Sequence, residues 1–226
     1  MNVFKVPVQP THDRYKVRGF ADFDWTQKRL VRLEISVGQP YHEGAKLQAA
    51  LEWANRHFDQ TVLLLGDTLQ RYNLMMDGVA AEQARKSAFD AGEQWLKRHA
   101  EYIKDLQIFR WDDVLQHPDF GIIRKKVGDL YQKDNHVKKM IDESIKEIAI
   151  RRHIESHRDV QFFDLSLQYL LEEITGAVIE NQLYPGVSAY PGSIPKFWGV
   201  INYIVSGSNL KNQENLNCIR LRMKSC

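Results

Sequence analysis

The sequence predicts a single α/β domain in which helices flank a mainly parallel sheet. Three observations lead to this prediction. Short apolar runs alternate with longer amphipathic segments along the chain. No internal repeat, low-complexity tract or linker divides the 226 residues. Hydrophobic residues make up 43% of the chain and charged residues 27%, a composition that allows one sizeable core.

The first elements form a recognisable unit. Residues 1–28 carry mixed charges without a hydrophobic period, so we expect an irregular N-terminal arm. The run 29–38 is apolar and β-branched and stops at Gly38, which predicts a strand followed by a loop. Apolar side chains recur at helical spacing over 43–58, and 61–65 is a continuous apolar run typical of a buried parallel strand. Strand, helix and strand in this order predict a right-handed βαβ unit.

The rest of the chain continues the alternation. Charged, amphipathic helices are expected at 79–104, 112–132 and 134–157, and a more apolar helix at 163–174. Ser193-Ile194-Pro195 resembles a helix start with proline in the first turn, so a last helix is expected through residue 205, before a loop at 206–209. Further strands are expected at 106–111, 186–190 and 216–223.

Composition excludes several classes of protein. No apolar run reaches the ~18–20 residues needed to cross a bilayer, and the start lacks a signal-peptide pattern, so we expect a cytoplasmic protein without a membrane partner. Cys218 and Cys226 should then stay reduced, and their spacing does not suit a zinc or redox motif. The net charge of +2 does not by itself indicate a nucleic-acid binder. The chain has neither a GxGxxG or GxxxxGKS/T phosphate loop nor a GxSxG nucleophile elbow.

Ser36 is a candidate nucleophile because of its place at the end of the first predicted strand. Ligands of doubly wound sheets bind outside the carboxyl ends of the strands. Flexible backbone at Gly38 could also bring N–H groups towards an oxyanion. The alternative interpretation is an ordinary strand-end serine bonded to backbone.

Tyr169 and Glu173 lie four residues apart on a predicted helix and therefore share a face. That face adjoins the apolar stripe, where desolvation raises the pKa of a carboxyl towards the range useful for proton transfer. The alternative is a surface glutamate beside a tyrosine. His153 and His157 share the same spacing, but arginines surround them and no third ligand is evident, so we expect no metal.

Together these segments resemble the cyclodipeptide synthase family over about Leu30 to Trp198. The first signature is a strand ending in Ile35-Ser36-Val37-Gly38, followed by a helix with Trp53, then Leu63-Leu64-Leu65-Gly66-Asp67-Thr68 and the turn Met76-Asp77-Gly78. The second is a helical Tyr169-x-x-x-Glu173 followed by Tyr190 at a strand end. Gln39 and Tyr190-Pro191 resemble the subfamily that has Tyr-Pro at the last tyrosine and a variable residue in place of Asn. Tyr184-Pro185-Gly186 is a rival alignment for the Tyr-Pro pair.

The resemblance implies a Rossmann-like fold similar to the catalytic domains of class I aminoacyl-tRNA synthetases. It also implies an aminoacyltransferase that takes two aminoacyl-tRNAs per cycle and releases a cyclic dipeptide (a 2,5-diketopiperazine) without ATP or another cofactor. By this resemblance, Ser36 carries an aminoacyl group in a ping-pong mechanism, Tyr169 and Glu173 hold its α-ammonium, Glu173 accepts a proton, and Tyr190 relays hydrogen bonds. A monomer is expected.

Binding surfaces follow from the same resemblance. The long helix after the Asp-Gly turn is expected to bind tRNA phosphates through Arg85, Lys86, Lys97 and Arg98, and further basic residues could share the role: Arg124, Lys125, Lys126, Lys138 and Lys139. Side-chain pockets beside the serine are expected from Leu33, Gly38, Gln39, Leu64, Gly66, Val187 and Pro191. Arg151 and Arg152 are expected either to reach the second of these side-chain pockets or to lie on a solvated helix end.

Two other functions remain compatible with the residues alone. One is a non-catalytic RNA-binding protein of the same fold, in which Ser36 and Glu173 have no chemical role. The other is a serine acyltransferase or hydrolase that uses another activated acyl donor, such as a small thioester. A covalent adduct on Ser36 would exclude the non-catalytic RNA-binding protein. A requirement for charged tRNA as the acyl donor would exclude the acyltransferase or hydrolase that uses another donor.

Overall fold

The structure is a computed structural model that describes residues 15–20, 30–154, 160–191, 198–201 and 218–225. Its centre is a six-stranded sheet in the order β1-β6-β5-β2-β3-β4. The strands are β1 (Tyr15–Phe20), β2 (Leu30–Ile35), β3 (Gln60–Leu65), β4 (Gln107–Arg110), β5 (Val187–Pro191) and β6 (Cys218–Ser225). All neighbouring strands are parallel except β1 and β6, which are antiparallel. The predicted α/β class with a mainly parallel sheet is confirmed.

The strand order reverses beside β2. From β2 the chain continues outward to β3 and β4, and it then returns to place β5 and β6 on the other side of β2. The carboxyl ends of β2 and β5 therefore form the switch point at which open α/β sheets bind ligands.

Helices were predicted more accurately in position than in extent. They are α1 (Gly44–His57), α2 (Arg71–Met76), α3 (Ala81–Ile103), α4 (Trp111–Leu115), α5 (Phe120–Lys133), α6 (Asn135–Arg151) and α7 (Val160–Leu183), with short 3-10 turns at Pro40–His42 and Thr68–Gln70. The helix expected at 112–132 is divided into α4 and α5, because Pro118 lies between them and lacks the N–H that a continuous helix needs. The helix expected at 163–174 continues to Leu183, and α2 was not predicted.

The expected irregular arm contains a strand. Residues 15–20 form β1, which owes its place to antiparallel pairing with β6 rather than to an apolar run. The rest of the arm and the loop expected at 206–209 lie outside the described residues, as do His157 and Cys226. Of the helix expected from Ser193 to 205, the structure describes residues 198–201, and these are helical.

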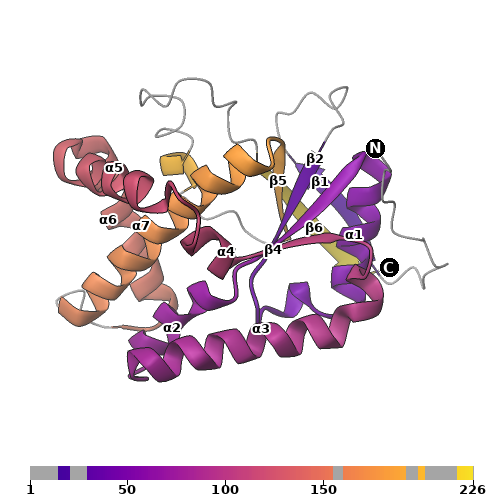
Figure 1. The fold of residues 1–226 in the computed structure, drawn as a ribbon, viewed down its shortest axis with the longest axis horizontal. Helices are drawn as coiled ribbons and strands as arrows, with labels where there is room; N and C mark the ends of the chain where they lie inside the picture. Colours follow the sequence, from indigo (N-terminus) through magenta and orange to yellow (C-terminus); the bar gives the residue numbers. More distant parts are fainter. Residues whose placement is uncertain (1–14, 21–29, 155–159, 192–197, 202–217, 226) are drawn as a thin grey trace.

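The two faces of the sheet differ in chemistry. On one face, apolar side chains of β2, β3, β5 and β6 pack with α1 and with the second half of α3 in one hydrophobic core. Helices α4 to α7 form a second core together with Leu69, Val200 and Ile201, and Figure 1 shows α5, α6 and α7 together on one side of the sheet. The sheet face towards α7 carries polar residues of β2 and β5, among them Arg32, Glu34 and Ser188. Within the described residues, no helix is long and apolar enough to span a membrane.

Candidate active site

A cavity of about 420 Å³ opens between the polar face of the sheet and helix α7. Predicted site residues from four separate parts of the chain line it: Ser36, Gln39, Leu64, Gly66, Tyr169, Glu173 and Tyr190. The structure thus brings together the predicted nucleophile, the helical Tyr-Glu pair and the last tyrosine at the switch point of the sheet.

The backbone of Ser36 is held by a histidine that the sequence analysis did not select. His42 is fully buried, and its Nδ1 lies 2.9 Å from the backbone nitrogen of Ser36. Burial lowers the pKa of His42 to about 4, so the ring is neutral at physiological pH. Trp95 of α3 donates from Nε1 to the His42 carbonyl at 3.0 Å. The loop after β2, which turns at Gly38 with φ +87°, is therefore fixed to α3.

The hydroxyl of Ser36 belongs to a chain of three hydroxyl groups. Ser36 Oγ lies 3.3 Å from Tyr190 Oη, which lies 2.8 Å from Tyr41 Oη. Burial raises the pKa of Tyr190 well above its usual value, so its phenol keeps its proton and can donate to an oxygen. Tyr41 was missed because it lies in a loop without periodicity. No imidazole nitrogen contacts Ser36 Oγ among the described residues, since His42 contacts the backbone instead.

Tyr169 and Glu173 face the cavity from α7, one turn apart. Burial, aided by the charge of Glu34, raises the pKa of Glu173 to about 8, although a hydrogen bond from Tyr169 and the charge of Arg151 oppose the shift. Burial also raises the pKa of Tyr169. At neutral pH Glu173 is therefore mostly protonated, and a cation bound beside it would favour the carboxylate.

Two further glutamates line the cavity, and the sequence analysis selected neither. Glu34 lies two residues before Ser36 on β2, and its Oε1 is buried without a hydrogen-bond partner. Burial raises its pKa to about 7. Glu180 lies seven residues after Glu173 on α7, with 4% of its surface exposed, and burial raises its pKa well above the usual value. Both glutamates could have been found in the sequence, because each is a polar residue that interrupts an apolar run.

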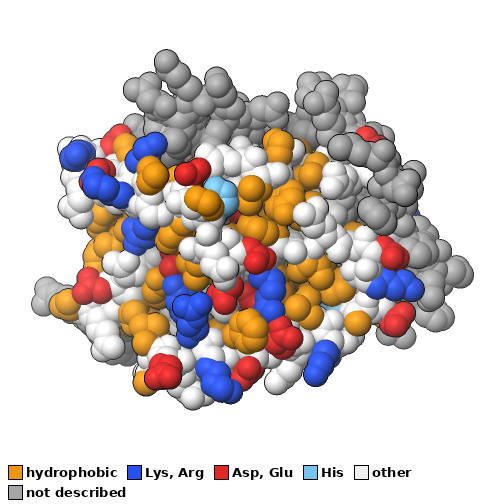
Figure 2. All heavy atoms as spheres, in the orientation of Figure 1, with side chains coloured by type: hydrophobic (Ala, Val, Ile, Leu, Met, Phe, Trp, Pro, Cys, Tyr) orange, Lys and Arg blue, Asp and Glu red, His pale blue; other side chains and the backbone are white. Residues whose placement is uncertain are grey.

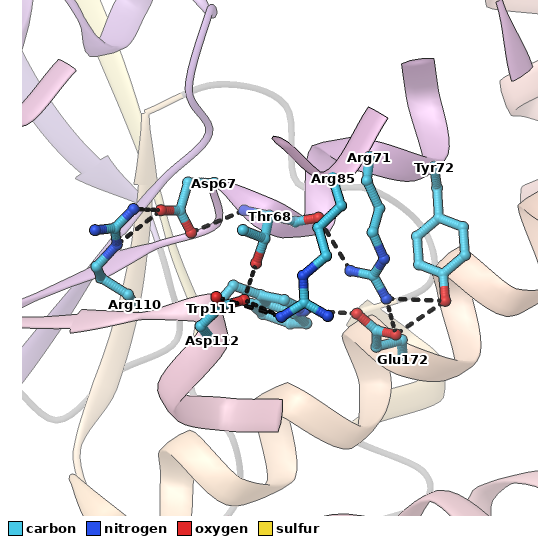
Figure 3. Close-up of polar contacts among 9 residues, drawn as sticks. All are labelled: Asp67, Thr68, Arg71, Tyr72, Arg85, Arg110, Trp111, Asp112 and Glu172. Carbon is cyan, nitrogen blue, oxygen red and sulfur yellow. Dashed lines mark hydrogen bonds and ion pairs between the residues drawn. The ribbon is translucent and has the colours of Figure 1, made fainter. Parts of the chain in front are cut away.

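Helix α7 is anchored by a second polar network behind the cavity (Figure 3). Glu172 is 5% exposed and accepts hydrogen bonds from Trp111 Nε1 at 2.7 Å, from Arg71 at 2.5 Å and from Tyr72 Oη at 2.9 Å. Gly176 permits this close approach, because a Cβ there would lie 2.3 Å from the Trp111 ring. Glu172 itself does not line the cavity, but by anchoring α7 it positions the neighbouring Glu173.

We expect Glu172→Ala to lower the free energy of unfolding by about 3 kcal/mol, because it leaves the half-buried Arg71 without its carboxylate. Urea unfolding followed by circular dichroism measures this loss. Glu143→Ala serves as the matched control, since its carboxylate lies 4.0 Å from Lys139 on the exposed face of α6. Equal effects of the two substitutions would contradict the anchoring role of Glu172.

Four of the predicted pocket residues lie outside the cavity lining. Leu33 and Val187 belong to the core on the opposite face of the sheet. The prediction for Leu33 was wrong because successive side chains of a strand point to opposite faces of the sheet. Glu34 and Ser36 point to the cavity, and Leu33 points to the opposite core. Gly38 is exposed in the loop after β2, and Pro191 is buried at the end of β5.

The four basic residues expected to bind tRNA lie on α3, and Figure 2 shows its basic side chains mixed with acidic ones. Three of them pair with acids: Arg85 with Asp112, Lys86 with Asp90, and Arg98 with Glu43. No ion pair of Lys97 is found within the described residues. Arg85 and Lys86 also line a second, more open hollow together with Arg71, Tyr72 and Phe89.

Other basic candidates are distributed over α5 and α6. Lys125, Lys138 and Lys139 pair with acids one turn away on their own helices, and Arg124 donates to Gln168 of α7. Arg151 and Arg152, at the end of α6, line the cavity, and Arg152 also bonds Asn73 and Asp77. His153 follows them with a positive φ, and no group of metal-binding side chains occurs in the described part of the chain.

Comparison with known proteins identifies the family. The sequence profile of cyclodipeptide synthases matches residues 22–175, more than half of the chain. The chain belongs to the cyclodipeptide synthase family. A cyclodipeptide synthase from Fluoribacter dumoffii matches this synthase with a TM-score of 0.82 and 24% identity, over 94% of this chain and 99% of that one. The synthase of Candidatus Glomeribacter gigasporarum, solved bound to Phe-tRNAPhe, matches with a TM-score of 0.64 and 18% identity, over 85% and 86% of the two chains.

Two further known proteins are similar to this chain. The cyclo(L-leucyl-L-phenylalanyl) synthase of Streptomyces noursei is 20% identical to this synthase over 185 residues, which are 74% of this chain and 75% of the relative. Tyrosyl-tRNA synthetase from Archaeoglobus fulgidus matches with a TM-score of 0.58 and 10% identity, over 87% of this chain and 55% of that one. The predicted similarity to class I aminoacyl-tRNA synthetases is confirmed for the fold.

Proposed function

We propose that this synthase makes a cyclic dipeptide from two aminoacyl-tRNAs by a ping-pong mechanism through an aminoacyl ester of Ser36. The observation that carries the proposal is the convergence of Ser36, Tyr190, Tyr169 and Glu173 on one cavity at the switch point of the sheet. An aminoacyl ester is already activated, so the site has to orient and desolvate its substrates rather than consume ATP. Gln39 and Tyr190-Pro191 support membership of the Tyr-Pro subfamily.

In the first half-reaction, Ser36 Oγ attacks the carbonyl carbon of the first aminoacyl-tRNA. A new ester bond to Ser36 forms, the bond to the ribose oxygen breaks, and the proton of Ser36 passes to that leaving oxygen. A ribose hydroxyl of the substrate is our candidate for the group that accepts the serine proton first. The phenol of Tyr190, 3.3 Å from Oγ and itself bonded to Tyr41, orients the serine hydroxyl.

In the second half-reaction, the amine of the enzyme-bound aminoacyl group attacks the ester of the second aminoacyl-tRNA. This step forms a peptide bond, releases the second tRNA and leaves a dipeptide on Ser36. The free amine of the dipeptide then attacks the Ser36 ester, which closes the ring and restores the serine hydroxyl. Tyr169 and Glu173 bind the α-ammonium, and Glu173 accepts the proton that the amine loses.

The overall activity is tested by incubating the purified synthase with a mixed pool of charged tRNAs without ATP and analysing the small molecules by mass spectrometry. We expect a cyclic dipeptide whose formation stops when the tRNAs are deacylated before mixing. A synthase that binds tRNA but yields no cyclic dipeptide from any pool would instead support the non-catalytic RNA-binding function.

The tRNA surface is assigned to α3, where Lys97 and Arg98 lie exposed within one turn. We expect the double substitution Lys97→Glu and Arg98→Glu to weaken tRNA binding about tenfold or more at low salt, and by a smaller factor as salt rises, because phosphate contacts release counterions. Filter binding at several salt concentrations measures the effect. Lys46→Glu with Arg56→Glu on α1 is the control of equal charge change. Unchanged binding of the α3 variant at low salt would overturn the assignment.

A further inference from the structure

We propose that Glu34 and Glu180 form a specificity floor that selects a cationic side chain on the aminoacyl group carried by Ser36. The inference rests on the proposed function, because it assigns a substrate class to the same cavity. It begins from two buried carboxyl groups that line the cavity and that the steps at Ser36 and Glu173 do not use.

The floor lies directly beneath the reacting groups. Residues two apart on a strand point to the same face and lie about 6.6 Å apart, which places Glu34 below Ser36 on β2. Helix α7 leads into β5, which is parallel to β2, so α7 runs in the opposite direction to both strands. Glu180 is two helical turns beyond Glu173, so the two residues share a face of α7, and both line the cavity. The two carboxyls interact, since the charge of Glu34 contributes to the raised pKa of Glu180.

The carboxyls of this floor have oxygens to offer a ligand. Glu34 Oε1 is buried without a hydrogen-bond partner. Glu180 is 4% exposed and lines the same cavity. An unpaired oxygen shielded from water favours a ligand that brings a hydrogen-bond donor, and disfavours an apolar group that brings none.

In the described part of the chain, three glutamates line the cavity, Glu34, Glu173 and Glu180, and one fully buried arginine, Arg32, lies close to them. Arg32 is fully buried and donates hydrogen bonds to Ser188 Oγ, Asn181 Oδ1 and the carbonyls of Tyr184 and Gly186. Its charge lowers the pKa of both floor glutamates, so it can balance one of them. The α-ammonium of the substrate balances Glu173. A second positive charge, supplied by the substrate side chain, would balance the remaining carboxylate.

Other charged groups near the cavity do not fill this role. Arg151 lines the cavity but is exposed at the end of α6, where solvent and salt screen its charge. Arg152 is engaged by Asn73 and Asp77. Arg220 of β6 pairs in register with Tyr190 of β5, and its Nε is buried without a hydrogen-bond partner, but Arg220 is not among the residues that line the cavity.

The dimensions also suit a long cationic side chain. The five single bonds from Cα to the ammonium of lysine, each about 1.5 Å, extend roughly 6 Å in a staggered chain. This length matches the step from Ser36 down to Glu34. A side chain anchored on Ser36 would therefore place its charge between the two floor carboxyls.

The test compares matched side chains on one tRNA. The same tRNA is charged chemically with lysine, norleucine, arginine or citrulline, and the rate at which Ser36 is acylated is followed by intact-protein mass spectrometry. We expect the cationic member of at least one pair to acylate Ser36 on the order of 100-fold faster than its neutral counterpart. The double variant Glu34→Gln, Glu180→Gln should reduce that ratio below about tenfold while still forming adducts.

Controls keep this inference separate from the proposed function. Glu101→Gln, whose side chain is 89% exposed, should keep the wild-type ratio. Thermal unfolding shows whether the double variant folds, and the single variants Glu34→Gln and Glu180→Gln give an intermediate ratio if both carboxyls contribute. Equal rates within both substrate pairs, or an unchanged ratio in the folded double variant, would overturn the specificity floor. Absence of any adduct with any charged tRNA would instead overturn the role of Ser36.

Discussion

Replacing Ser36 by alanine should abolish both the cyclic dipeptide and any aminoacyl adduct of the protein. The reason is that every proposed step passes through an ester of this hydroxyl, and no other serine, threonine or cysteine lines the cavity within the described residues. We expect a loss of product of about 10⁴-fold or more, as for the removal of other covalent nucleophiles. Product yield and intact mass, measured with the same pool of charged tRNAs, test this expectation together.

Two controls make the result specific to the hydroxyl. Ser87→Ala on α3 removes a hydroxyl that lies outside the cavity and accepts a hydrogen bond from Gln83 Nε2 at 3.0 Å, and it should leave the yield unchanged. Binding of charged tRNA to the Ser36→Ala variant should also persist, because the tRNA surface is assigned to α3. Product formation by the alanine variant at a rate near that of the wild type would mean that the dipeptide forms without a covalent intermediate.

Replacing Glu173 by glutamine should separate the two halves of the reaction. The amide keeps the shape of the side chain but cannot accept a proton, so we expect the aminoacyl-enzyme to accumulate while cyclic dipeptide release falls by about 100-fold or more. A time course that records intact mass and product from one mixture measures both quantities. Normal turnover in this variant would exclude Glu173 as the proton acceptor.

The raised pKa of Glu173 also predicts how Glu173→Gln changes the free energy of unfolding. Burial raises the pKa of Glu173 to about 8, so the folded protein holds this proton more tightly than the unfolded chain. The stabilisation from that proton is complete below the unfolded pKa, near 4.5, and is lost as pH rises through about 8. Glutamine never has to ionise, so the variant should be more stable than the wild type at pH 8. This result would show that its loss of turnover is not a loss of folding.

The parts of the fold that the sequence predicted are those with strong local signals. The unit β2–α1–β3 has continuous apolar strands and a periodic helix, and it was predicted to within a few residues. Strand β1 has no such pattern, since it forms by pairing with β6 at the other end of the chain. The length of α7 was underestimated because its second half, 175–183, is nearly all buried and so shows little alternation between apolar and polar faces.

The site was predicted where residue type and spacing coincide, and missed where only the tertiary structure brings groups together. Tyr169 and Glu173 share a helix face, so their spacing placed them correctly in one cavity. Leu33 was expected at a side-chain pocket because of its position near the serine, but strand alternation turns it into the opposite core. Tyr41 reaches Tyr190 across the sheet edge, a contact between residues 149 positions apart that no local pattern reports.

The central claim is that Ser36 carries an aminoacyl group during the reaction, and intact-protein mass spectrometry tests it most directly. The synthase is mixed briefly with a pool of charged tRNAs, the reaction is quenched in acid, and the intact mass of the protein is measured. The protein is then digested, and the modified peptide is sequenced. We predict a mass increase equal to one aminoacyl group, located on Ser36 and removed by mild base. Cyclic dipeptide formation with no adduct at any time, in the wild type and in Glu173→Gln alike, would contradict the covalent mechanism.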